Sequence, residues 1–358
     1  MAKLERDKNG FAELHGAEVR LLLHSRFYPS VGGIETVADL LTQEWVKAGV
    51  KVCVVTDVDA PRDDGRPFPF PVIYRPSPRR LMKLVLAHDV FVHFNISLRA
   101  LWPLIFVRRP FVAVHHGFYV NDESGHRDWR ERLKLFIAKY ATENIAVSKA
   151  VAESIGIECK IVLNPFEANV YQTPERQTRD RDLAFLGRLV SSKGAHILIE
   201  ALARVKKSQL KPNLTIIGDG PERGALEELV RQLKLDDRVS FVGFIPTTDV
   251  AKTLQRQKVL VVPSIWNEGF GVVALEGIAT GCVVVGSDSG GLPEAIGPCG
   301  LIVQTGKPAA LAFAIEQVLT DHDLAEKLRA YAPKHLNRHS PKRVASDYVV
   351  IISKFLSK

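Results

Sequence analysis

The sequence has no long apolar run. No stretch reaches the ~18 uncharged apolar residues that a membrane-spanning helix needs, and charged residues such as Lys83, Asp89 and Arg99 interrupt its most apolar region. Residues 1–16 carry both signs of charge and lack the apolar core of a secretory signal. The sequence therefore predicts neither a transmembrane anchor nor export by a secretory signal.

Cysteines are few and far apart. Cys53, Cys159, Cys282 and Cys299 form no C-x-x-C pair, which fits neither a zinc site nor a disulfide framework. The chain also lacks the Gly-x-Ser-x-Gly turn of a hydrolase, a GKS or GKT phosphate loop and the His-Glu pair of a metalloprotease. We therefore expect a reduced, cytoplasmic, soluble protein.

The composition is that of a globular chain. Its 358 residues are 46% hydrophobic and 25% charged, which excludes disordered and fibrous proteins and predicts two domains. The net charge is +8, and residues 75–139 hold twelve Lys and Arg against five Asp and Glu, a local charge of +7. This basic stretch should attract an anionic partner: nucleic acid, an acidic lipid surface or a phosphorylated substrate.

Short apolar runs alternate with longer amphipathic segments, a pattern typical of parallel α/β layers. In the first half, the sequence predicts strands at 19–25, 50–56, 89–94, 110–116, 143–148 and 160–166, and helices at 34–48 and 127–140. The polar passage 167–182 is interpreted as a linker. In the second half, it predicts strands at 182–188, 213–218, 238–244, 258–264, 282–286 and 300–303, and helices at 196–207, 221–235, 248–257, 272–280 and 293–296. Two such halves predict an α/β protein with two doubly wound domains facing each other across a cleft, where ligands bind at the carboxyl ends of the strands.

Two segments combine glycine or basic residues with a strand-to-helix junction. Gly32 and Gly33 precede a helix whose exposed N–H groups attract anions, although a tight turn explains them equally well. Arg188 ends a strand and Lys193 follows five residues later. Two cations placed there can neutralise a diphosphate; the alternative is that they only solubilise the surface.

Glycines 218, 220 and 224 are spaced much like a dinucleotide-binding fingerprint. A nicotinamide site also needs an acidic residue at the end of the next strand, and the strand 238–244 ends without one. We therefore reject a dehydrogenase.

The most specific segment is PSIWNEGFGVVALEGIATG, residues 263–281. Glu268 lies in a loop, Gly269, Phe270 and Gly271 follow, and a helix begins near Val272 with Glu276 in its second turn. Exposed amides there bind phosphate or sugar oxygens, and carboxylates suit hydroxyl groups.

Other polar residues are weaker candidates. His115 and His116 end a strand, where a structural role is as plausible as a functional one. Asp57-Val58-Asp59 imitates a metal-binding D-x-D motif, but no His or third carboxylate is near in the sequence. We expect no metal and no cofactor.

Together these segments resemble the retaining nucleotide-sugar glycosyltransferases of family 4, which have the GT-B fold. The matching pieces are SVGGIE (30–35), VHHG (114–117), LGRLVSSKG (186–194), IIGDGPERGAL (216–226), VSFVGF (239–244), PSIWNEGFGVVALEGIATG (263–281) and SGGLPEAI (289–296). One departure is Asn164-Pro165-Phe166, where many members have Asn-Gly-Val. The resemblance implies an acceptor-binding domain over 1–170, a nucleotide-sugar-binding domain over 171–340, and a helix over 341–358 that crosses back to the first domain.

The resemblance also implies roles for single residues. Arg188 and Lys193 would neutralise the diphosphate. Glu268 would grip the sugar and Glu276 the ribose hydroxyls. The amides of Val272 and Val273 would also contact the diphosphate, and Gly33 would approach its β-phosphate. The amides of Phe270 and Gly271 would bind the sugar, and His116 would contact the sugar's primary hydroxyl region. The base would contact Gly218, Gly243 and Ile245.

The function implied is retaining transfer of a hexose from a UDP- or GDP-sugar to a glycan or lipid-linked acceptor in cell-surface polysaccharide or glycolipid synthesis. A nucleic-acid- or polyanion-binding protein is the alternative that the basic stretch favours, but it leaves the segment from Glu268 to Glu276 unexplained, and no nucleic-acid motif is evident. A GT-B-like epimerase or a pyridoxal-dependent phosphorylase is a further alternative.

Within the basic stretch, the helix at 127–140 is amphipathic, with Trp129, Leu133, Phe136, Ile137 and Tyr140 on one face and cations beside it. Such a helix can lie on an anionic lipid surface or bury the same face in the domain core, and the sequence leaves both open. If it meets lipid, the protein docks peripherally on the inner face of the cytoplasmic membrane.

Overall fold

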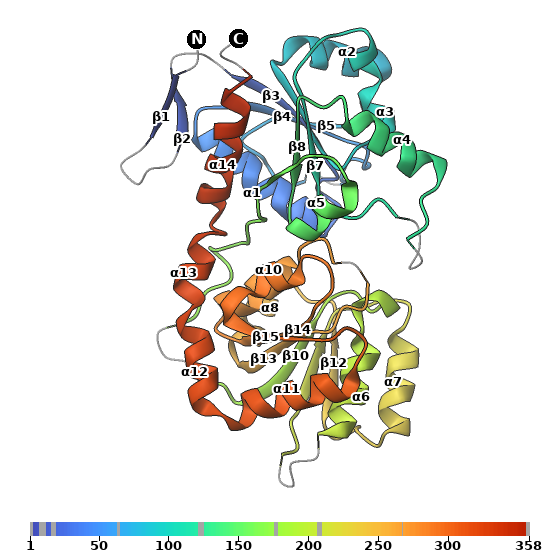
Figure 1. Cartoon of the computed structure of the whole chain (residues 1–358), viewed down its shortest axis with the longest axis vertical. Coiled ribbons are helices and arrows are strands. Elements are labelled where there is room, and N and C mark those ends of the chain that lie inside the picture. Colours follow the sequence, from blue (N-terminus) through green and yellow to red (C-terminus); the bar gives the residue numbers. More distant parts are fainter. Residues whose placement is uncertain are drawn as a thin grey trace. The chain divides into compact units, whose positions relative to one another are not determined.

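The computed structural model describes residues 3–6, 12–15, 19–62, 65–120, 125–174, 178–205, 210–266 and 268–355. The chain divides into two compact units: unit 1 comprises Met1–Phe166 and His339–Lys358, and unit 2 comprises Glu167–Arg338. The sequence predicts the divisions after residues 170 and 340, so both observed divisions come slightly earlier in the chain. Each unit is an α/β domain with one parallel sheet (Figure 1).

Unit 1 contains a seven-stranded sheet in the order β5-β4-β3-β6-β7-β8-β9, and every neighbouring pair of strands is parallel. Its strands are β3 (Arg20–His24), β4 (Lys51–Thr56), β5 (Val72–Tyr74), β6 (Val90–Phe94), β7 (Phe111–His115), β8 (Glu143–Ala146) and β9 (Lys160–Ile161). A separate antiparallel pair is formed by β1 (Lys3–Arg6) and β2 (Ala12–His15). The predicted strand at 160–166 is therefore longer than the observed β9.

The helices of unit 1 are α1 (Gly33–Lys47), α2 (Pro78–Ala87), α3 (Leu98–Leu101), the 3₁₀ helix η1 (Trp102–Ile105), α4 (Trp129–Ala138), α5 (Lys149–Ile155) and α14 (Pro341–Ser353). Side-chain caps fix three of their starts: Ser77, Asp128 and Ser148 each accept a hydrogen bond from a backbone N–H in the first turn of the helix that follows. Within the described residues, no helix is both long and apolar enough to cross a bilayer.

Helix α14 supplies part of the unit 1 core, although it comes from the far end of the chain. Its Tyr348 packs edge-on against Trp45 of α1, with 5.6 Å between ring centroids, and the Trp45 indole N–H donates to the Ala345 carbonyl at 3.3 Å. Residues 341–358 carry apolar residues at helical spacing, and Val344, Val349 and Ile352 of this set are buried. Leu356, of the same set, lies outside the described residues.

Unit 2 contains a six-stranded parallel sheet in the order β12-β11-β10-β13-β14-β15. Its strands are β10 (Arg181–Leu186), β11 (Leu214–Ile217), β12 (Val239–Gly243), β13 (Gln257–Val262), β14 (Val283–Ser287) and β15 (Gly300–Val303). Its helices are α6 (Ala195–Arg204), α7 (Arg223–Gln232), α8 (Thr247–Gln255), α9 (Val272–Ala279), α10 (Leu292–Ile296), α11 (Pro308–Thr320), α12 (His322–Ala330) and α13 (Ala332–Asn337), with 3₁₀ turns η2 (Ser191–Lys193) and η3 (Gly297–Cys299). Figure 1 shows α6 and α11 on one face of the sheet and α8 and α10 on the other.

The strand order of unit 2 defines where a ligand should bind. From β10 the chain adds β11 and β12 in one direction, and it then returns to add β13, β14 and β15 in the other. The order therefore reverses between β10 and β13. Ligands of doubly wound sheets bind outside the carboxyl ends of the strands at such a reversal, which makes the segments after Leu186 and Val262 the first place to examine.

Candidate functional site

Lys193 and Glu268 meet at this reversal point, although 75 residues separate them in the chain. The Lys193 ammonium lies 2.6 Å from Glu268 Oε2, and the Ser264 hydroxyl donates to the same oxygen at 3.1 Å. The side chains of Lys193 and Glu268 are 37% and 18% exposed. The pair is thus accessible to a ligand, while its carboxylate is largely shielded from water.

Backbone contacts bring the two residues together. The turn η2 lies against the loop after β13, where the Ser192 carbonyl accepts a hydrogen bond from the Ile265 N–H at 2.9 Å. Gly194 follows the turn with φ +70°, and a Cβ at this position would lie 2.0 Å from the Pro263 carbonyl oxygen. Only glycine fits both the left-handed backbone and this close approach, so Gly194 fixes the position of Lys193.

The start of α9 adjoins Glu268. Gly271 is the N-cap of α9, and the amides of Val272 and Val273 belong to its first turn, where N–H groups have no partner within the helix. On its other side the Glu268 backbone is held by Gly291, whose N–H donates to the Glu268 carbonyl at 2.7 Å. The Phe270 side chain is buried beneath the loop. A cation, a carboxylate and a helix N-terminus therefore share one small region of unit 2.

Arg188 follows β10 at the same end of the sheet. Its side chain is exposed, and it forms no ion pair with the part of the chain that the structure describes. An exposed guanidinium at a ligand-binding sheet edge can bind an incoming anion without first breaking an ion pair. Arg188 and Lys193 thus differ in this structure, because Lys193 already holds a carboxylate.

The three residues assigned to a base pocket lie together at the ends of β11 and β12. The Gly218 N–H donates to the Gly243 carbonyl at 2.9 Å, and Ile245 follows two residues after Gly243 and is partly buried. Gly218 has φ +132°, and a Cβ there would lie 2.0 Å from the Gly187 carbonyl oxygen. Gly218 thus allows the chain after β11 to pass close to the chain after β10.

Glu276 lies in α9 beside a partner that sequence reasoning missed. Burial, and to a smaller extent the nearby Glu167, raise the pKa of its carboxyl from 4.5 to about 8, against the opposing effect of a hydrogen bond with Tyr171. Tyr171 is 4% exposed, and burial raises the pKa of its phenol well above the usual value. In the ligand-free protein Glu276 is therefore mostly protonated at neutral pH.

The interpretation of residues 167–182 as a linker is wrong. The Thr173 hydroxyl donates to the Ala279 carbonyl at 2.8 Å. The guanidinium of Arg179 donates to the carbonyls of Gln257 and Thr280 at 2.8 and 3.0 Å. The described part of this passage therefore belongs to unit 2 and satisfies carbonyl groups at the end of α9. Its polar composition reflects those hydrogen bonds. Residues 175–177 lie outside the described residues.

The two site residues assigned to unit 1 have different surroundings. Gly33 is the first residue of α1, and a Cβ there would have no atom within 4 Å, so packing within the unit does not require glycine. His116 is buried, its ring centroid lies 4.5 Å from that of Phe94, and burial lowers its pKa to about 3. The imidazole is therefore neutral at physiological pH. His115 is structural: its ring nitrogens contact the Tyr119 hydroxyl at 2.7 Å and Asn144 Oδ1 at 3.0 Å.

The two carboxylates of the D-x-D motif have separate partners. Asp57 contacts His24 Nε2 at 3.3 Å, and the hydrogen bond with His24 lowers the pKa of the Asp57 carboxyl. Asp59 pairs with Arg75 at 2.6 Å. Among the residues that can be described, no three His, Cys, Asp or Glu side chains gather as a metal site.

Family models match both halves of the chain. The model for group 1 glycosyl transferases matches residues 169–335, and the model for glycosyltransferase family 4 matches residues 31–160. An uncharacterised glycosyltransferase of Methanocaldococcus jannaschii is 34% identical over 299 residues, which cover 74% of each chain. The D-inositol 3-phosphate glycosyltransferase of Corynebacterium urealyticum is 36% identical over 176 residues, which cover 47% of this chain and only 41% of that relative.

Solved structures share the fold at low sequence identity. Anabaena HepE, solved in complex with UDP and glucose, superimposes with a TM-score of 0.78 at 20% identity, covering 94% of this chain and all of the other. The sucrose-phosphate synthase of Thermosynechococcus elongatus also gives a TM-score of 0.78, at 21% identity, covering 95% of this chain and all of the other. At these identities the likeness establishes the architecture.

Proposed function

The chain belongs to the family 4 type of glycosyltransferases, with the GT-B fold, and we propose that it transfers a hexose from a UDP- or GDP-sugar to a glycan or lipid-linked acceptor. The transfer retains the anomeric configuration. The observation that carries the proposal is the contact of Lys193 with Glu268 beside the start of α9, at the strand-order reversal of unit 2. The UDP and glucose bound by Anabaena HepE support a nucleotide-sugar donor.

In this proposal the donor diphosphate binds among positive groups. Arg188, Lys193 and the amides of Val272 and Val273 surround it, and Gly33 approaches the β-phosphate. Lys193 exchanges part of its contact with Glu268 for a phosphate oxygen, which leaves the Glu268 carboxylate to accept hydrogen bonds from the sugar hydroxyls. The local geometry supports this exchange, because both side chains are accessible and only 2.6 Å apart. No metal is needed to balance the charge.

The remaining donor contacts follow from the same placement. Glu276 accepts hydrogen bonds from the ribose hydroxyls, and Gly218, Gly243 and Ile245 line the base site. The amides of Phe270 and Gly271 bind the sugar. His116 contacts the sugar's primary hydroxyl region, and its neutral ring can donate a hydrogen bond there without adding a charge.

The proposed reaction breaks the bond between the anomeric carbon and the β-phosphate oxygen, whose electron pair stays on the phosphate. The acceptor oxygen attacks the oxocarbenium-like carbon from the same face, and its proton passes to the departing phosphate. Charge therefore develops on the diphosphate, where fixed cations and amides stabilise it. Removing one such donor costs ~2.7–4 kcal/mol in enzymes where this has been measured.

We place this reaction in cell-surface polysaccharide or glycolipid synthesis, in the cytoplasm or on the inner face of the cytoplasmic membrane. The basic stretch 75–139 supports an acceptor with anionic groups. A polyanion-binding protein and a nucleotide-sugar epimerase are the competing functions that a direct test must separate from transfer.

A panel of UDP- and GDP-sugars tests the function. We expect one nucleotide to raise the melting temperature, since a ligand at 100 times its Kd stabilises the folded state by about 2.7 kcal/mol, and we expect slow hydrolysis of the matching sugar donor. An epimerase would interconvert the sugar without releasing it. Salt-sensitive DNA retention with no stabilisation by any nucleotide would contradict the proposal.

The affinity for the nucleotide should rise with pH between about 6 and 8. Glu276 has a pKa of about 8 in the ligand-free protein, and ribose hydroxyls that donate to it favour the ionised form. Binding then releases a proton, so affinity increases by up to about tenfold per pH unit and levels off above pH 8. Calorimetric titrations of wild type and Glu276→Gln at several pH values measure the effect.

Glu276→Gln is also the control. The diphosphate ionises in the same way in titrations of both proteins, so a difference in pH dependence between them comes from Glu276. The variant should lack the extra pH dependence of nucleotide affinity. Equal slopes of affinity against pH in the two proteins would contradict a contact between Glu276 and the ribose.

The same carboxyl should affect the stability of the fold. Because folding raises the pKa of Glu276, the protonated carboxyl stabilises the folded state fully below about pH 4.5, and this effect is lost as the pH rises through 8. Glu276→Gln should therefore melt at a higher temperature than wild type at pH 9.

A further inference from the structure

Helix α4 exposes a row of large apolar side chains. Trp129, Phe136 and Tyr140 are 67%, 54% and 73% exposed, and Leu133 between them is 38% exposed. Their spacing places Trp129, Leu133 and Phe136 on one side of the helix. Tyr140 follows in the turn after α4, with its ring centroid 5.3 Å from that of Phe136; we call these four residues the α4 stripe. The core side of the helix is formed by Leu135 and Ala138. Of the two interpretations left open by the sequence, burial of the stripe in the core of unit 1 is therefore wrong.

Cations flank the α4 stripe on both sides. Arg132 and Lys139 lie along one flank and are exposed. Arg130 lies on the other, with its guanidinium carbon 5.3 Å from the centroid of the Trp129 ring. Long basic side chains beside an apolar row are typical of helices that lie in a membrane interface.

The acidic residues of α4 do not cancel this charge. Glu131 pairs with Lys134 at 2.6 Å, and Asp128 caps the helix by accepting the Glu131 N–H at 2.9 Å. Arg130, Arg132 and Lys139 thus remain as the cations beside the stripe. Asp122 and Glu123, the acids that precede the helix in the sequence, lie outside the described residues.

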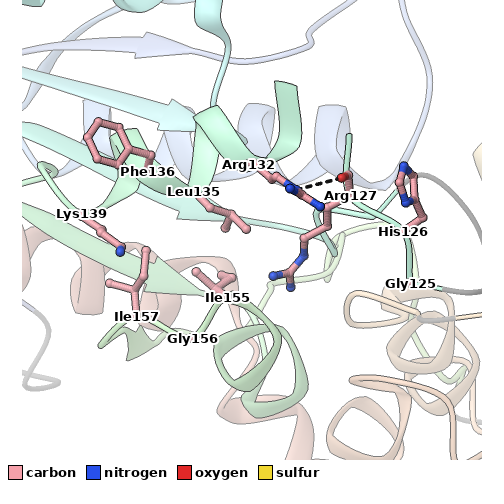
Figure 2. Close-up of a pocket in the computed structure, with 10 residues that line it drawn as sticks. All are labelled: Gly125, His126, Arg127, Arg132, Leu135, Phe136, Lys139, Ile155, Gly156 and Ile157. Atoms are coloured by element: carbon pink, nitrogen blue, oxygen red, sulfur yellow. Dashed lines mark hydrogen bonds between the residues drawn. The ribbon is translucent and has the colours of Figure 1, made fainter. Parts of the chain in front are cut away.

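A pocket of about 740 Å³ opens beside the stripe. Figure 2 shows Leu135 and Ile155 turned toward each other, with Lys139 at one end and Arg127 at the other. The Arg127 guanidinium is held by the carbonyls of Tyr119 and Ser154 at 3.1 and 2.5 Å, and Arg132 Nε donates to the Arg127 carbonyl at 3.2 Å. The pocket therefore combines an apolar floor with a cationic rim.

We propose that α4 docks the protein on an anionic lipid bilayer, with the α4 stripe at the boundary of head groups and acyl chains. The phosphate of a lipid head group occupies the adjacent pocket, facing Arg132 and Lys139. The inference rests on the proposed function in one respect: docking brings the enzyme to a lipid-linked acceptor. Charge complementarity and the exposed stripe together select a bilayer, because a soluble polyanion would not use the apolar row.

Vesicle flotation tests the docking. We expect wild type to bind vesicles of phosphatidylcholine mixed with phosphatidylglycerol, and to bind phosphatidylcholine vesicles weakly. The double variant Arg132→Ala/Lys139→Ala should lose about twenty-five-fold in affinity, since each basic residue near an anionic surface strengthens binding roughly fivefold. Trp129→Ala/Phe136→Ala should also bind weakly, and high salt should release the wild-type protein.

Matched controls come from unit 2. Phe313 in α11 is 62% exposed, and Lys307 and Lys327 are exposed cations; Phe313→Ala and Lys307→Ala/Lys327→Ala should bind vesicles like wild type. A second readout is tryptophan emission, which should shift to shorter wavelength on binding in wild type. In Trp129→Phe the shift should largely disappear while binding persists.

Equal binding to the two kinds of vesicle, or wild-type binding by both α4 variants, would overturn the docking. A third outcome would also overturn the docking: the protein binds no vesicles but forms a concentration-dependent dimer that the same substitutions disrupt. The α4 stripe would then contact a second copy of the chain. Stabilisation by UDP or GDP is measured without lipid. If docking fails while nucleotide binding is intact, the proposed function stands and the docking proposal is wrong. If nucleotide binding fails while docking is intact, the proposed function is wrong and the docking proposal stands.

Discussion

Replacing Lys193 with alanine is expected to lower kcat by about 10²–10³-fold, the loss found when one donor to a developing oxyanion is removed. Two effects combine. The departing phosphate loses a cation, and the Glu268 side chain, which is 18% exposed, keeps the hydrogen bond from the Ser264 hydroxyl but loses its ion-pair partner. Arg188→Ala should cause a loss of similar size, with little change in stability because its side chain is exposed. Steady-state transfer or hydrolysis assays measure both.

Lys258 is the matched control for Lys193. It also pairs with a partly buried carboxylate, Asp182, at 2.8 Å, but it lies near the amino end of β13. Lys258→Ala should therefore change stability slightly and kcat not at all. If Lys193→Ala retains wild-type turnover while it remains folded, the proposed stabilisation of the leaving diphosphate is wrong.

Replacing Gly194 with alanine is expected to destabilise unit 2 by about 2–5 kcal/mol. The left-handed backbone costs a non-glycine residue roughly 1–2 kcal/mol, and forcing an added methyl against backbone adds about 1–3 kcal/mol, since its Cβ would lie 2.0 Å from the Pro263 carbonyl oxygen. Because η2 must move to relieve that overlap, Lys193 should also leave Glu268 and activity should fall. Urea unfolding and the kinetic assay measure the two losses.

Gly224 provides the matched glycine. It lies in the first turn of α7, and an added Cβ would have no atom within 4 Å. Gly224→Ala should be neutral or stabilise by up to ~1 kcal/mol, because alanine favours helix. Equal unfolding free energies for the two variants would show that close packing against Pro263 is not what selects glycine at position 194.

The sequence predicts the fold well where apolar periodicity is strong. The buried strands β4, β6 and β13 are runs of apolar residues at their predicted positions, and α1 begins within one residue of the expected start. The segment from Pro263 to Gly281 places Glu268 in a loop and Glu276 on a helix, as expected. Local pattern suffices here because a continuous apolar run and the residues at a helix start are both features of neighbouring residues in the chain.

Contacts between distant segments could not be predicted in the same way. The pairing of Lys193 with Glu268 depends on which strands are neighbours, and nothing in the sequence around either residue encodes that order. The sequence predicts a linker around Tyr171 and Arg179, because polar residues that bond to carbonyl groups cannot be told by composition from polar residues that face water. For α4, hydrophobic spacing shows that one face is apolar, but it does not show whether that face is buried.

The return of α14 to unit 1 has a consequence for how the protein is made. The ribosome completes α1 early, but Trp45 meets Ala345 and Tyr348 only after the 300 residues from Trp45 to Ala345, all of unit 2 among them, have been synthesised. At about 5–20 residues per second this delay is roughly 15–60 s. During this interval the Trp45 indole, which is buried in the finished protein, lacks its contacts with α14. The second unit, encoded as one continuous segment, can therefore mature before the first, and nascent unit 1 is where a chaperone would be needed.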